Sequence, residues 1–429
     1  MNILILNHCA HNKGDNSVLY YLSHKLRNKK KVTRLILSSS DGRRPFWGTN
    51  KIFDSICYWG MGLTFKEFDS FFSTKLYLKV KNYFYKNFIF KLIIWLYSIN
   101  NNSINKIVIK IFYNKKFLNE IKNADAVIST GGHHISSGLD SNLLNAQLCD
   151  MVVTLVYEKK LMLWSQSIGP IETKFNFVKK TLKKLFNETK VIVPRDKETL
   201  KFLGKDVIKS KKINKYCPDS VCGIIRMNDI NLSKSSNLPK NNALVCIYSA
   251  KKRKEKDHIK YVNDIAEISD FLSTKGIVPV LFPMQYKNMA GDEREILKEI
   301  IKKTKNKKTI IFDKDKSPKN TLSMFKKTNL VIGHKMHSVI YGLSLAIPII
   351  AICYHKKQNL LMNTFGMKQY AINDQNLNFK KVNNKIISLI KNKNAIRKKL
   401  KKHSLRVSKI VNDTFDSSFN ELTKIKVKI

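Results

Sequence analysis

Acidic residues are scarce in this sequence. Only 32 of the 429 residues are Asp or Glu, against 79 Lys or Arg, so the formal net charge at pH 7 is +47. A positive excess of this size favours anionic partners such as phosphates, acidic lipid head groups or nucleic acid. The lysines are spread along the chain, however, and a compositional bias explains such a pattern equally well. No RNP, zinc-finger or helix–turn–helix pattern is present, so we expect no nucleic-acid partner.

Paired cysteines and long apolar runs are missing as well. The seven cysteines are scattered and form no CxxC pair, which argues against a zinc ribbon and predicts a reducing compartment without a disulfide framework. No apolar stretch reaches the ~18 residues that a membrane-spanning helix needs. The first residues lack the basic region and cleavage site of a signal peptide. We therefore expect a cytoplasmic protein, and contact with the inner face of the membrane stays open.

Short apolar runs alternate with amphipathic segments through most of the chain, which is the pattern of a parallel α/β sheet. The first series of predicted strands comprises Ile3–Leu6, Val32–Leu37, Ala126–Ser129, Leu161–Trp164 and Val191–Val193. The second series comprises Leu244–Tyr248, Val278–Phe282, Thr309–Phe312, Leu330–Ile332 and Ile349–Cys353. Because 429 residues exceed what one ordinary core holds, each series predicts its own domain.

Composition sets the expected boundaries. We predict an N-terminal α/β domain over 1–228, a linker rich in Asn, Ser and Lys over 229–242, a C-terminal α/β domain over 243–378 and a basic helical tail over 379–429. Within the first domain, residues 41–62 are rich in Gly, Trp and Arg and predict a long loop.

Residues 65–117 differ from the rest of the first domain, because they are dense in Phe, Tyr, Ile and Lys and contain almost no acid after Asp69. One interpretation is an amphipathic helical insertion that rests on a membrane, with aromatic rings at the level of the head groups and lysines reaching phosphates. The other is a helical part of the domain core, since aromatic stripes usually pack internally.

Polar motifs follow the predicted strands of the first series, where ligands of parallel sheets bind. They are Asn12-Lys13-Gly14-Asp15, Gly131-Gly132-His133-His134, Gln166-Ser167-Ile168-Gly169-Pro170 and Arg195-Asp196, with Asp219 as a weaker case. Paired glycines let a ligand approach the backbone, His133 can donate to an anion, and Arg195 can bind a carboxylate or phosphate with two hydrogen bonds. Each motif also has a plain structural interpretation: helix capping by Asp15, a tight turn at the glycines, and a surface salt bridge of Arg195.

The densest cluster lies in the second series. Gly333-His334-Lys335-Met336-His337-Ser338 follows one predicted strand and opens a helix, and Tyr354-His355-Lys356-Lys357 follows the next strand. A cation and an imidazole at a helix N-terminus make an anion site with an attached acid or base. Solvated lysines and a buried, hydrogen-bonded histidine would explain either piece alone, but two consecutive strand ends of the same chemistry favour a site. No metal-ligand spacing is present, so no metal is expected.

Taken in order, these motifs resemble the polysaccharide pyruvyl transferase family. The matching pieces are N-x-G-D at Asn12–Asp15, Gly131-Gly132, Q-x-I-G-P at Gln166–Pro170, Arg195-Asp196, R-x-H at Lys335–His337, Y-x-x-K at Tyr354–Lys357, and Phe365-Gly366. They span residues 1 to about 370. Lys335 stands where the family usually has arginine, which keeps the charge but loses the planar two-pronged geometry.

The resemblance implies an α/β fold with two Rossmann-like domains facing across a cleft, as in GT-B proteins. It implies transfer of a pyruvyl group, as a ketal, from phosphoenolpyruvate on the C-terminal domain to a sugar on the N-terminal domain. The sugar would belong to a cell-surface polysaccharide or its lipid-linked precursor, and no cofactor beyond this co-substrate is expected. In this scheme the catalytic residues are His337, as general acid or base, and Arg195, which binds the substrate anion together with Lys335 and Lys357. The expected substrate-binding residues are Lys335, Lys357, Gly131, Gly132, Gln166, Asn12, Asp15 and His133.

Two other functions stay open at this point. A GT-B glycosyltransferase that uses a nucleotide sugar would share the architecture, and Glu293 or Asp292 could then bind the ribose. A non-catalytic glycan-assembly protein held against a membrane would fit Lys335 and the aromatic, basic segment.

Overall fold

The structure is a computed structural model of the whole chain, and it describes residues 1–9, 12–39, 52–58, 60, 83–137, 144–204, 213, 216–226, 238–248, 254–286, 292–312, 314 and 316–424. The chain forms two compact units. Unit 1 consists of Met1–Ala10, Val18–Ser220 and Val411–Ile429, and unit 2 consists of His11–Ser17 and Val221–Ile410. Most of the predicted linker 229–242 lies outside the described residues, and so do residues 65–82 of the aromatic segment.

Unit 1 contains a parallel sheet whose described strands run in the order β3-β2-β1-β4-β6-β5, with β7 also paired to β6. The strands are β1 (Asn2–His8), β2 (Arg34–Ser39), β3 (Ser55–Tyr58), β4 (Ala126–Ser129), β5 (Gly132–Ile135), β6 (Lys160–Ile168) and β7 (Val191–Pro194). In the middle of the sheet, Leu4 of β1 lies opposite Ile36 on one side and Val127 on the other. The apolar runs are buried because helices cover both faces of the sheet.

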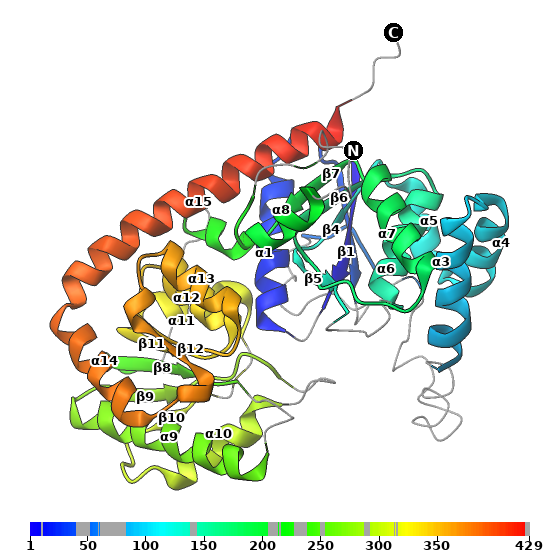
Figure 1. The fold of residues 1–429 in the computed structure, drawn as a ribbon. Coiled ribbons are helices and arrows are strands. Elements are labelled where there is room, and N and C mark those ends of the chain that lie inside the picture. Colours follow the sequence, from blue (N-terminus) through cyan, green and yellow to red (C-terminus); the bar gives the residue numbers. More distant parts are fainter. Residues whose placement is uncertain are drawn as a thin grey trace. The chain divides into compact units, whose positions relative to one another are not determined.

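Figure 1 shows α5, α6 and α7 on one face of this sheet and α1 and α8 on the other. The helices are α1 (Lys13–Arg27), the π-helix η1 (Tyr85–Ile89), α3 (Phe90–Ser98), α4 (Asn102–Phe112), α5 (Lys115–Asn123), α6 (Ala146–Val156), α7 (Asn176–Glu188) and α8 (Lys197–Gly204). The end of α15 (Lys393–Thr423) packs here too, where Phe415 contacts Trp164 and Tyr21.

The described part of the aromatic segment, residues 83–117, forms η1, α3, α4 and the start of α5, and these helices allow a choice between its two interpretations. Their inner faces belong to the same hydrophobic core as β1, β4 and β6, through residues such as Phe90, Ile93, Tyr97 and Phe117. On η1, α3 and α4, the outer faces carry large apolar side chains that remain exposed. The segment is therefore core on one side and apolar surface on the other.

Unit 2 contains a second parallel sheet, with the order β10-β9-β8-β11-β12-β13 among the described strands. They are β8 (Asn242–Cys246), β9 (Val278–Leu281), β10 (Ile310–Ile311), β11 (Leu330–Gly333), β12 (Ile349–Cys353) and β13 (Ala371–Asn373). The chain starts in the middle at β8, runs outward to β10, and then crosses to β11 and runs outward the other way. This reversal places a topological switch point between β8 and β11.

The helices of unit 2 also form two layers. Figure 1 shows α9, α10 and α14 on one face of the sheet and α11, α12 and α13 on the other. They are α9 (Glu255–Thr274), α10 (Glu293–Lys303), α11 (Pro318–Lys326), α12 (Met336–Ser344), α13 (Lys356–Thr364) and α14 (Phe379–Lys391). Three short 3-10 helices complete the described elements: η3 (Ser220–Arg226), η4 (Lys368–Tyr370) and η5 (Asp374–Asn376).

The predicted strands are present, but several local expectations were wrong. β3 lies inside the predicted loop 41–62, because Ile56 and Cys57 are buried against β2. The tight turn expected after Gly131 is instead the extended strand β5, which pairs with the end of β6. The first helix, α1, begins at Lys13. Its cap is Asn12, whose side chain accepts the backbone N–H of Gly14, and not Asp15.

None of the helices in the described ranges is both long enough and apolar enough to cross a membrane. All seven cysteines are free thiols, and every one except Cys9 is buried.

A buried carboxyl group on α6 lies between Gly60 and Tyr113, the residue that ends α4. Asp150 of α6 accepts the backbone N–H of Gly60 at 3.2 Å and lies beside Tyr113. Burial raises the pKa of Asp150 to about 7, although these two neighbours lower it. Since the folded pKa lies above the unfolded one, the folded state retains a proton that the unfolded state loses between about pH 4 and 7.

Asp150 should therefore stabilise unit 1 at low pH and lose this contribution as the pH rises to about 7. We expect a slope of up to about 1.4 kcal/mol per pH unit in the free energy of unfolding. Asp150→Asn should remove this slope, and Asp257→Asn on the exposed side of α9 should leave it unchanged. Urea unfolding at several pH values measures both. An unchanged slope in Asp150→Asn would show that the carboxyl group is ionised in the folded state.

Candidate functional site

The switch point of unit 2 gathers the polar motifs of the second series. Tyr248 follows β8, while His334 and Lys335 follow β11 directly, so these side chains share one edge of the sheet. Ligands of open α/β sheets bind at this position. The ring of Tyr248 stacks on Tyr354, which follows β12, with centroids 4.3 Å apart and an interplanar angle of 12°.

Lys335 forms an ion pair that the sequence did not predict. It is the N-cap of α12, and its Nζ donates to Oε1 of Glu293 at 3.0 Å and to Oε1 of Gln285 at 2.7 Å. The other carboxylate oxygen of Glu293 accepts the backbone N–H groups of Met284 and Gln285. Burial raises the pKa of Glu293, and Lys335 and these N–H groups oppose that shift. The charge of Lys335 is thus largely balanced within the protein.

The Asn12–Asp15 motif belongs to unit 2 and meets the Lys335–His337 motif there. Asn12 forms a β-bridge with Gln285, the residue that binds Lys335. Gly14 lies against His337 so closely that a Cβ on Gly14 would be 2.0 Å from Nδ1 of the imidazole. Two motifs that are more than three hundred residues apart in the sequence therefore form one continuous surface of the candidate site. We call this surface, made by Asn12–Gly14, Gln285, Lys335 and His337, the wall.

Lys13, which the sequence analysis left without a role, is part of the same wall. It is 5% exposed, and its Nζ lies 4.7 Å from the ring centroid of Tyr286 and 3.3 Å from the backbone oxygen of Lys316. Tyr341 of α12 donates its hydroxyl to the backbone oxygen of Lys13 at 2.9 Å. These contacts fix the start of α1 against α12.

His334 is fully buried behind this wall. Its Nδ1 is 2.8 Å from the hydroxyl of Tyr261, and its Nε2 is 3.4 Å from Oδ1 of Asp374. Its backbone oxygen accepts the side-chain amide of Gln358, the third residue of α13. Gln358 also accepts the N–H of His355, which completes a capping box at the start of α13. Lys357 lies in that first turn, one strand away from Lys335.

The other first-series motifs lie in unit 1, at the carboxyl ends of its strands. Gln166 near the end of β6 donates to the backbone oxygen of Gly132 at 3.2 Å and accepts, through its own backbone oxygen, the N–H of Arg195 at 2.9 Å. The two glycines are tightly enclosed: a Cβ on Gly131 would be 3.0 Å from the oxygen of Ser165, and one on Gly132 would be 2.5 Å from the ring of His134. The space beside Gly132 is thus filled by a side chain.

Arg195 is not bonded to Asp196 as its structural interpretation suggested, but forms an ion pair with Asp219. Asp196 instead caps α8 by accepting the N–H of Thr199, and it also accepts the hydroxyl of Ser167. Next to this pair, Nε2 of His133 is 2.6 Å from the oxygen of Gly169. Burial, together with the charges of His133 and Arg195, lowers the pKa of His134 to about 4, so this imidazole is neutral at pH 7.

The predicted site residues therefore fall into two groups. Unit 2 brings together Asn12, Asp15, Lys335, His337 and, on the next helix, Lys357; unit 1 brings together Gly131, Gly132, His133, Gln166 and Arg195. The sequence analysis missed Lys13, Tyr248, Tyr261 and Gln358. Tyr248 ends a predicted strand, and the rule applied to the other strand ends would have found it.

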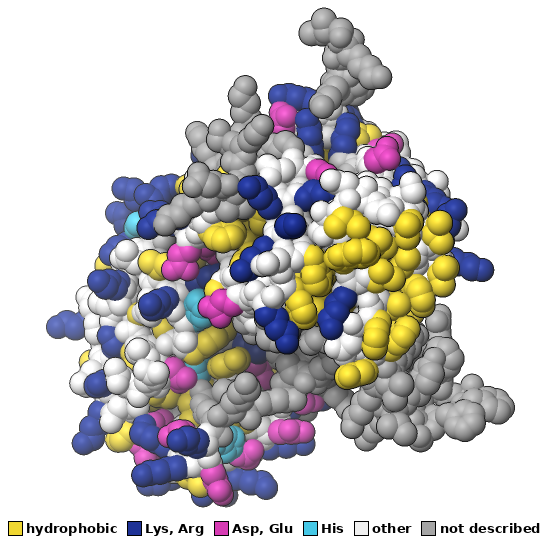
Figure 2. Space-filling view, turned by 45° about the vertical axis from the view of Figure 1, so that its right-hand side comes forward, with side chains coloured by type: hydrophobic (Ala, Val, Ile, Leu, Met, Phe, Trp, Pro, Cys, Tyr) yellow, Lys and Arg dark blue, Asp and Glu magenta, His cyan; other side chains and the backbone are white. Residues whose placement is uncertain are grey.

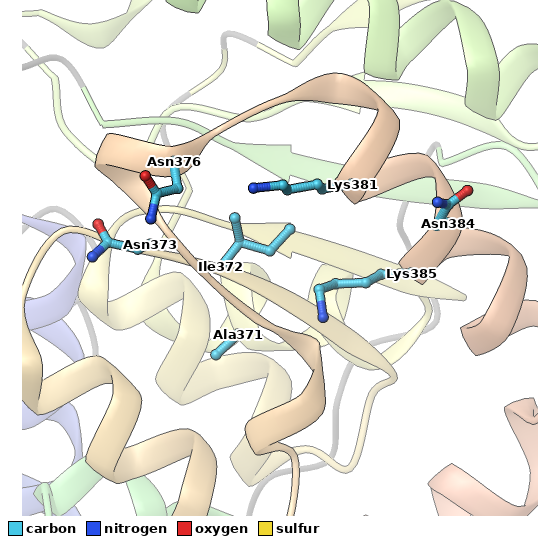
Figure 3. A pocket seen from close by; sticks show the side chains of 7 residues that line it. All are labelled: Ala371, Ile372, Asn373, Asn376, Lys381, Asn384 and Lys385. Carbon is cyan, nitrogen blue, oxygen red and sulfur yellow. The ribbon is translucent and has the colours of Figure 1, made fainter.

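A pocket of about 430 Å³ lies elsewhere in unit 2, at the edge strand β13. It is lined by Ala371, Ile372, Asn373, Asn376, Lys381, Asn384 and Lys385. Figure 3 shows both lysine side chains reaching from α14 toward the strand. Lys385 Nζ donates to the backbone oxygen of Gln369. None of the predicted site residues lines this pocket. In the part of the chain that the structure describes, no three His, Cys, Asp or Glu side chains are grouped so that they could hold a metal ion.

Solved structures define the class of this fold. The chain is similar to the UDP-GlcNAc 2-epimerase of Neisseria meningitidis bound to UDP-GlcNAc, with a TM-score of 0.54 and 10% identity over 97% of this chain and 100% of that one. It is similar to Anabaena HepE in complex with UDP and glucose, with a TM-score of 0.57 and 9% identity over 98% and 99%. It is also similar to the UDP-GlcNAc 2-epimerase of Methanocaldococcus jannaschii, with a TM-score of 0.54 and 12% identity over 89% and 90%. The chain is thus a two-domain α/β protein of the GT-B type, as predicted.

The family follows from the sequence. The family model for polysaccharide pyruvyl transferases matches residues 12–356, and this chain belongs to that family. The match begins at the motif that meets His337 and ends in the first turn of α13. No curated protein matches the sequence.

Proposed function

We propose that this protein transfers a pyruvyl group from phosphoenolpyruvate to a sugar of a cell-surface polysaccharide or of its lipid-linked precursor. The observation that carries the proposal is the meeting of Asn12–Gly14 with His337 at the switch point of unit 2. Both pieces belong to the motif set of the family, and folding places them on one wall at the edge where α/β sheets bind ligands.

The chemistry requires an acid or base beside an anion site. One sugar hydroxyl adds to C2 of phosphoenolpyruvate while C3 takes a proton, phosphate leaves, and a neighbouring hydroxyl closes the ketal. The two hydroxyl protons end on the new methyl group and on phosphate. We assign the proton transfer to His337 and the binding of carboxylate and phosphate to Lys357 and the N-terminal turns of α12 and α13.

Lys335 and Arg195 contribute less to binding the carboxylate and phosphate in this scheme, because Glu293 and Asp219 balance their charges. We propose that Lys335 positions the wall around Gln285, and that Arg195 organises the acceptor side with Gln166, Gly131, Gly132 and His133. Phosphoenolpyruvate is then a co-substrate, and the proposal includes no other cofactor. A cytoplasmic location is part of the same proposal.

The nucleotide-sugar alternative is weakened by the two carboxylates that it would use for ribose. Glu293 is engaged by Lys335 and two backbone N–H groups. Asp292 caps α10, and both of its carboxylate oxygens accept hydrogen bonds from the guanidinium of Arg294. The similarity to proteins solved with UDP compounds shows the fold alone, because the identities are about 10%.

Thermal unfolding with a panel of ligands tests the proposal. Phosphoenolpyruvate should raise the melting temperature more than pyruvate plus phosphate, UDP-sugars or GDP-sugars do, because one ligand carries both anionic groups. A ligand at ~100 times its Kd stabilises the folded state by about 2.7 kcal/mol, which is a shift of several degrees. Lys357→Gln should reduce the shift, whereas Lys298→Gln on the exposed face of α10 should not.

The outcomes separate the three functions. A larger shift with a UDP-sugar would support the glycosyltransferase. Release of phosphate from phosphoenolpyruvate on mixing with candidate glycans would support the pyruvyl transferase directly. No shift and no turnover with any of these compounds would leave the non-catalytic glycan-assembly protein as the better account.

A further inference from the structure

Among the described residues of unit 1, η1, α3 and α4 carry an extended apolar surface. Of the seventeen large hydrophobic residues that are exposed among the described residues, nine lie here, within a stretch of 29 residues. We call them the outer face: Tyr83, Phe84, Phe88, Leu92, Trp95, Ile99, Ile104, Ile107 and Ile111. Figure 2 shows a continuous hydrophobic area on the side of the molecule where these helices lie.

The spacing of these residues makes one surface from two helices. Along η1 and α3, Phe84, Phe88, Leu92, Trp95 and Ile99 recur every three or four residues and so lie on one side of the helix. On α4 the same spacing holds for the three exposed isoleucines, and α4 packs against α3. The side chains protrude well into solvent: Phe88 is 57% exposed and Ile111 is 67% exposed.

The inner faces of the same helices are buried in the core of unit 1. Ile93, Ile94 and Tyr97 are fully buried, and Asn105 donates its side-chain amide to the backbone oxygen of Ile93 at 3.0 Å. The outer face is therefore not required to hold these helices in place. An apolar surface of this extent on a folded domain marks an interaction site.

The charges around the outer face identify its partner. Residues 83–119 contain six lysines and no Asp or Glu. Lys110 of α4, which precedes Ile111 in the sequence, is exposed, and so are Lys115 and Lys116 at the start of α5. Lysine is depleted in protein–protein interfaces, whereas helices that lie in the surface of a bilayer combine Trp, Phe and Leu with lysines that reach anionic head groups.

We propose that the outer face docks this protein on an anionic lipid bilayer, with α3 and α4 lying in the plane of the head groups. The apolar side chains enter the boundary between head groups and acyl chains, and the lysines contact lipid phosphates. The docking is peripheral and reversible. It does not depend on the identity of the donor or the acceptor sugar.

Flotation of the full-length protein with vesicles tests this inference. The protein should float with phosphatidylcholine vesicles that contain phosphatidylglycerol and much less with phosphatidylcholine alone. Phe88→Ser combined with Trp95→Ser should weaken binding about tenfold or more, because affinity scales with the apolar area inserted. The matched control is Ile259→Ser with Leu360→Ser, two equally exposed residues of unit 2, and it should bind as the wild type does.

The electrostatic part has its own variants. Changing Lys110, Lys115 and Lys116 to Gln should weaken binding to the anionic vesicles by roughly fivefold per lysine, with little effect on neutral vesicles. The same changes at Lys298, Lys302 and Lys303, which are exposed on α10, serve as the control. All of the substituted side chains are exposed, so circular dichroism should show unchanged folding.

Three results would overturn the inference. The first is absence of flotation in the wild type, and the second is flotation that the outer-face substitutions leave unchanged. The third is self-association without lipid, seen by sedimentation and abolished by Phe88→Ser with Trp95→Ser, because the face would then be covered by a second copy of the chain. Quenching of Trp emission by brominated lipids, lost in Trp95→Phe, would confirm insertion at this face.

Discussion

Replacing His337 by Ala should lower the turnover of phosphoenolpyruvate by roughly 10²–10⁴-fold, the usual contribution of a positioned acid or base. His337 is the second residue of α12 at the switch point, and its ring lies between Gly14 and Tyr341. Imidazoles can exchange a proton near neutral pH. His337 is only partly buried as a residue, so we expect little loss of folding. Steady-state kinetics with circular dichroism as the folding control measures both.

A second substitution tests the position of this imidazole without removing it. Gly14→Ala would place a Cβ 2.0 Å from Nδ1 of His337, so the ring must move away. Turnover should fall in this variant too. Gly204→Ala, where a Cβ meets nothing within 4 Å, and His258→Ala on α9 are the matched controls and should be active. Normal turnover in His337→Ala would exclude the residue from the mechanism.

Replacing Lys335 by Met should destabilise the protein by about 3–5 kcal/mol, the usual effect of removing one partner of a buried ion pair. The carboxylate of Glu293 is only 2% exposed and would lose its cation. Lys335→Arg keeps the charge and should be tolerated, with substrate binding equal to or better than that of the wild type. Lys424→Met, which breaks an exposed ion pair with Glu421, should cost no more than about 1 kcal/mol.

The loss of stability in Lys335→Met should become larger as the pH rises. Without the ammonium, the pKa of Glu293 rises further above its unfolded value. The folded state then binds a proton that the unfolded state has lost, so the variant is most stable at low pH and loses stability as the pH rises. Urea unfolding at pH 5 and pH 8 measures this. The double variant with Glu293→Gln should recover part of the loss, and an equal loss at both pH values would contradict the assignment.

The pattern of apolar runs was sufficient to predict most strands and the two α/β series, because a strand buried on both faces leaves an uninterrupted signal in the sequence. The two short strands β5 and β13 were not predicted. β13 has three residues, and β5 begins with Gly132 and continues with two histidines, so neither carries that signal. The predicted site motifs lie at strand ends, as expected from the rule for parallel sheets.

Partners far apart in the chain could not be predicted. Arg195 was expected to bind a substrate anion or, in the alternative interpretation, Asp196 or Glu198, but its partner is Asp219. Lys335 was expected to bind a substrate anion, but Glu293 reaches it from the start of α10. In both cases the order of strands in the sheet decides which carboxylate is nearest, and local spacing carries no information about that order.

Unit 2 is not a continuous piece of the chain, because it is completed by His11–Ser17. These residues supply the Gly14 surface behind His337 and the backbone oxygen that accepts the hydroxyl of Tyr341. Unit 1 in turn includes Val411–Ile429 from the other end. No single cut of the polypeptide therefore yields either unit whole, and a fragment that begins at Val221 lacks the Asn12–Gly14 part of the candidate site.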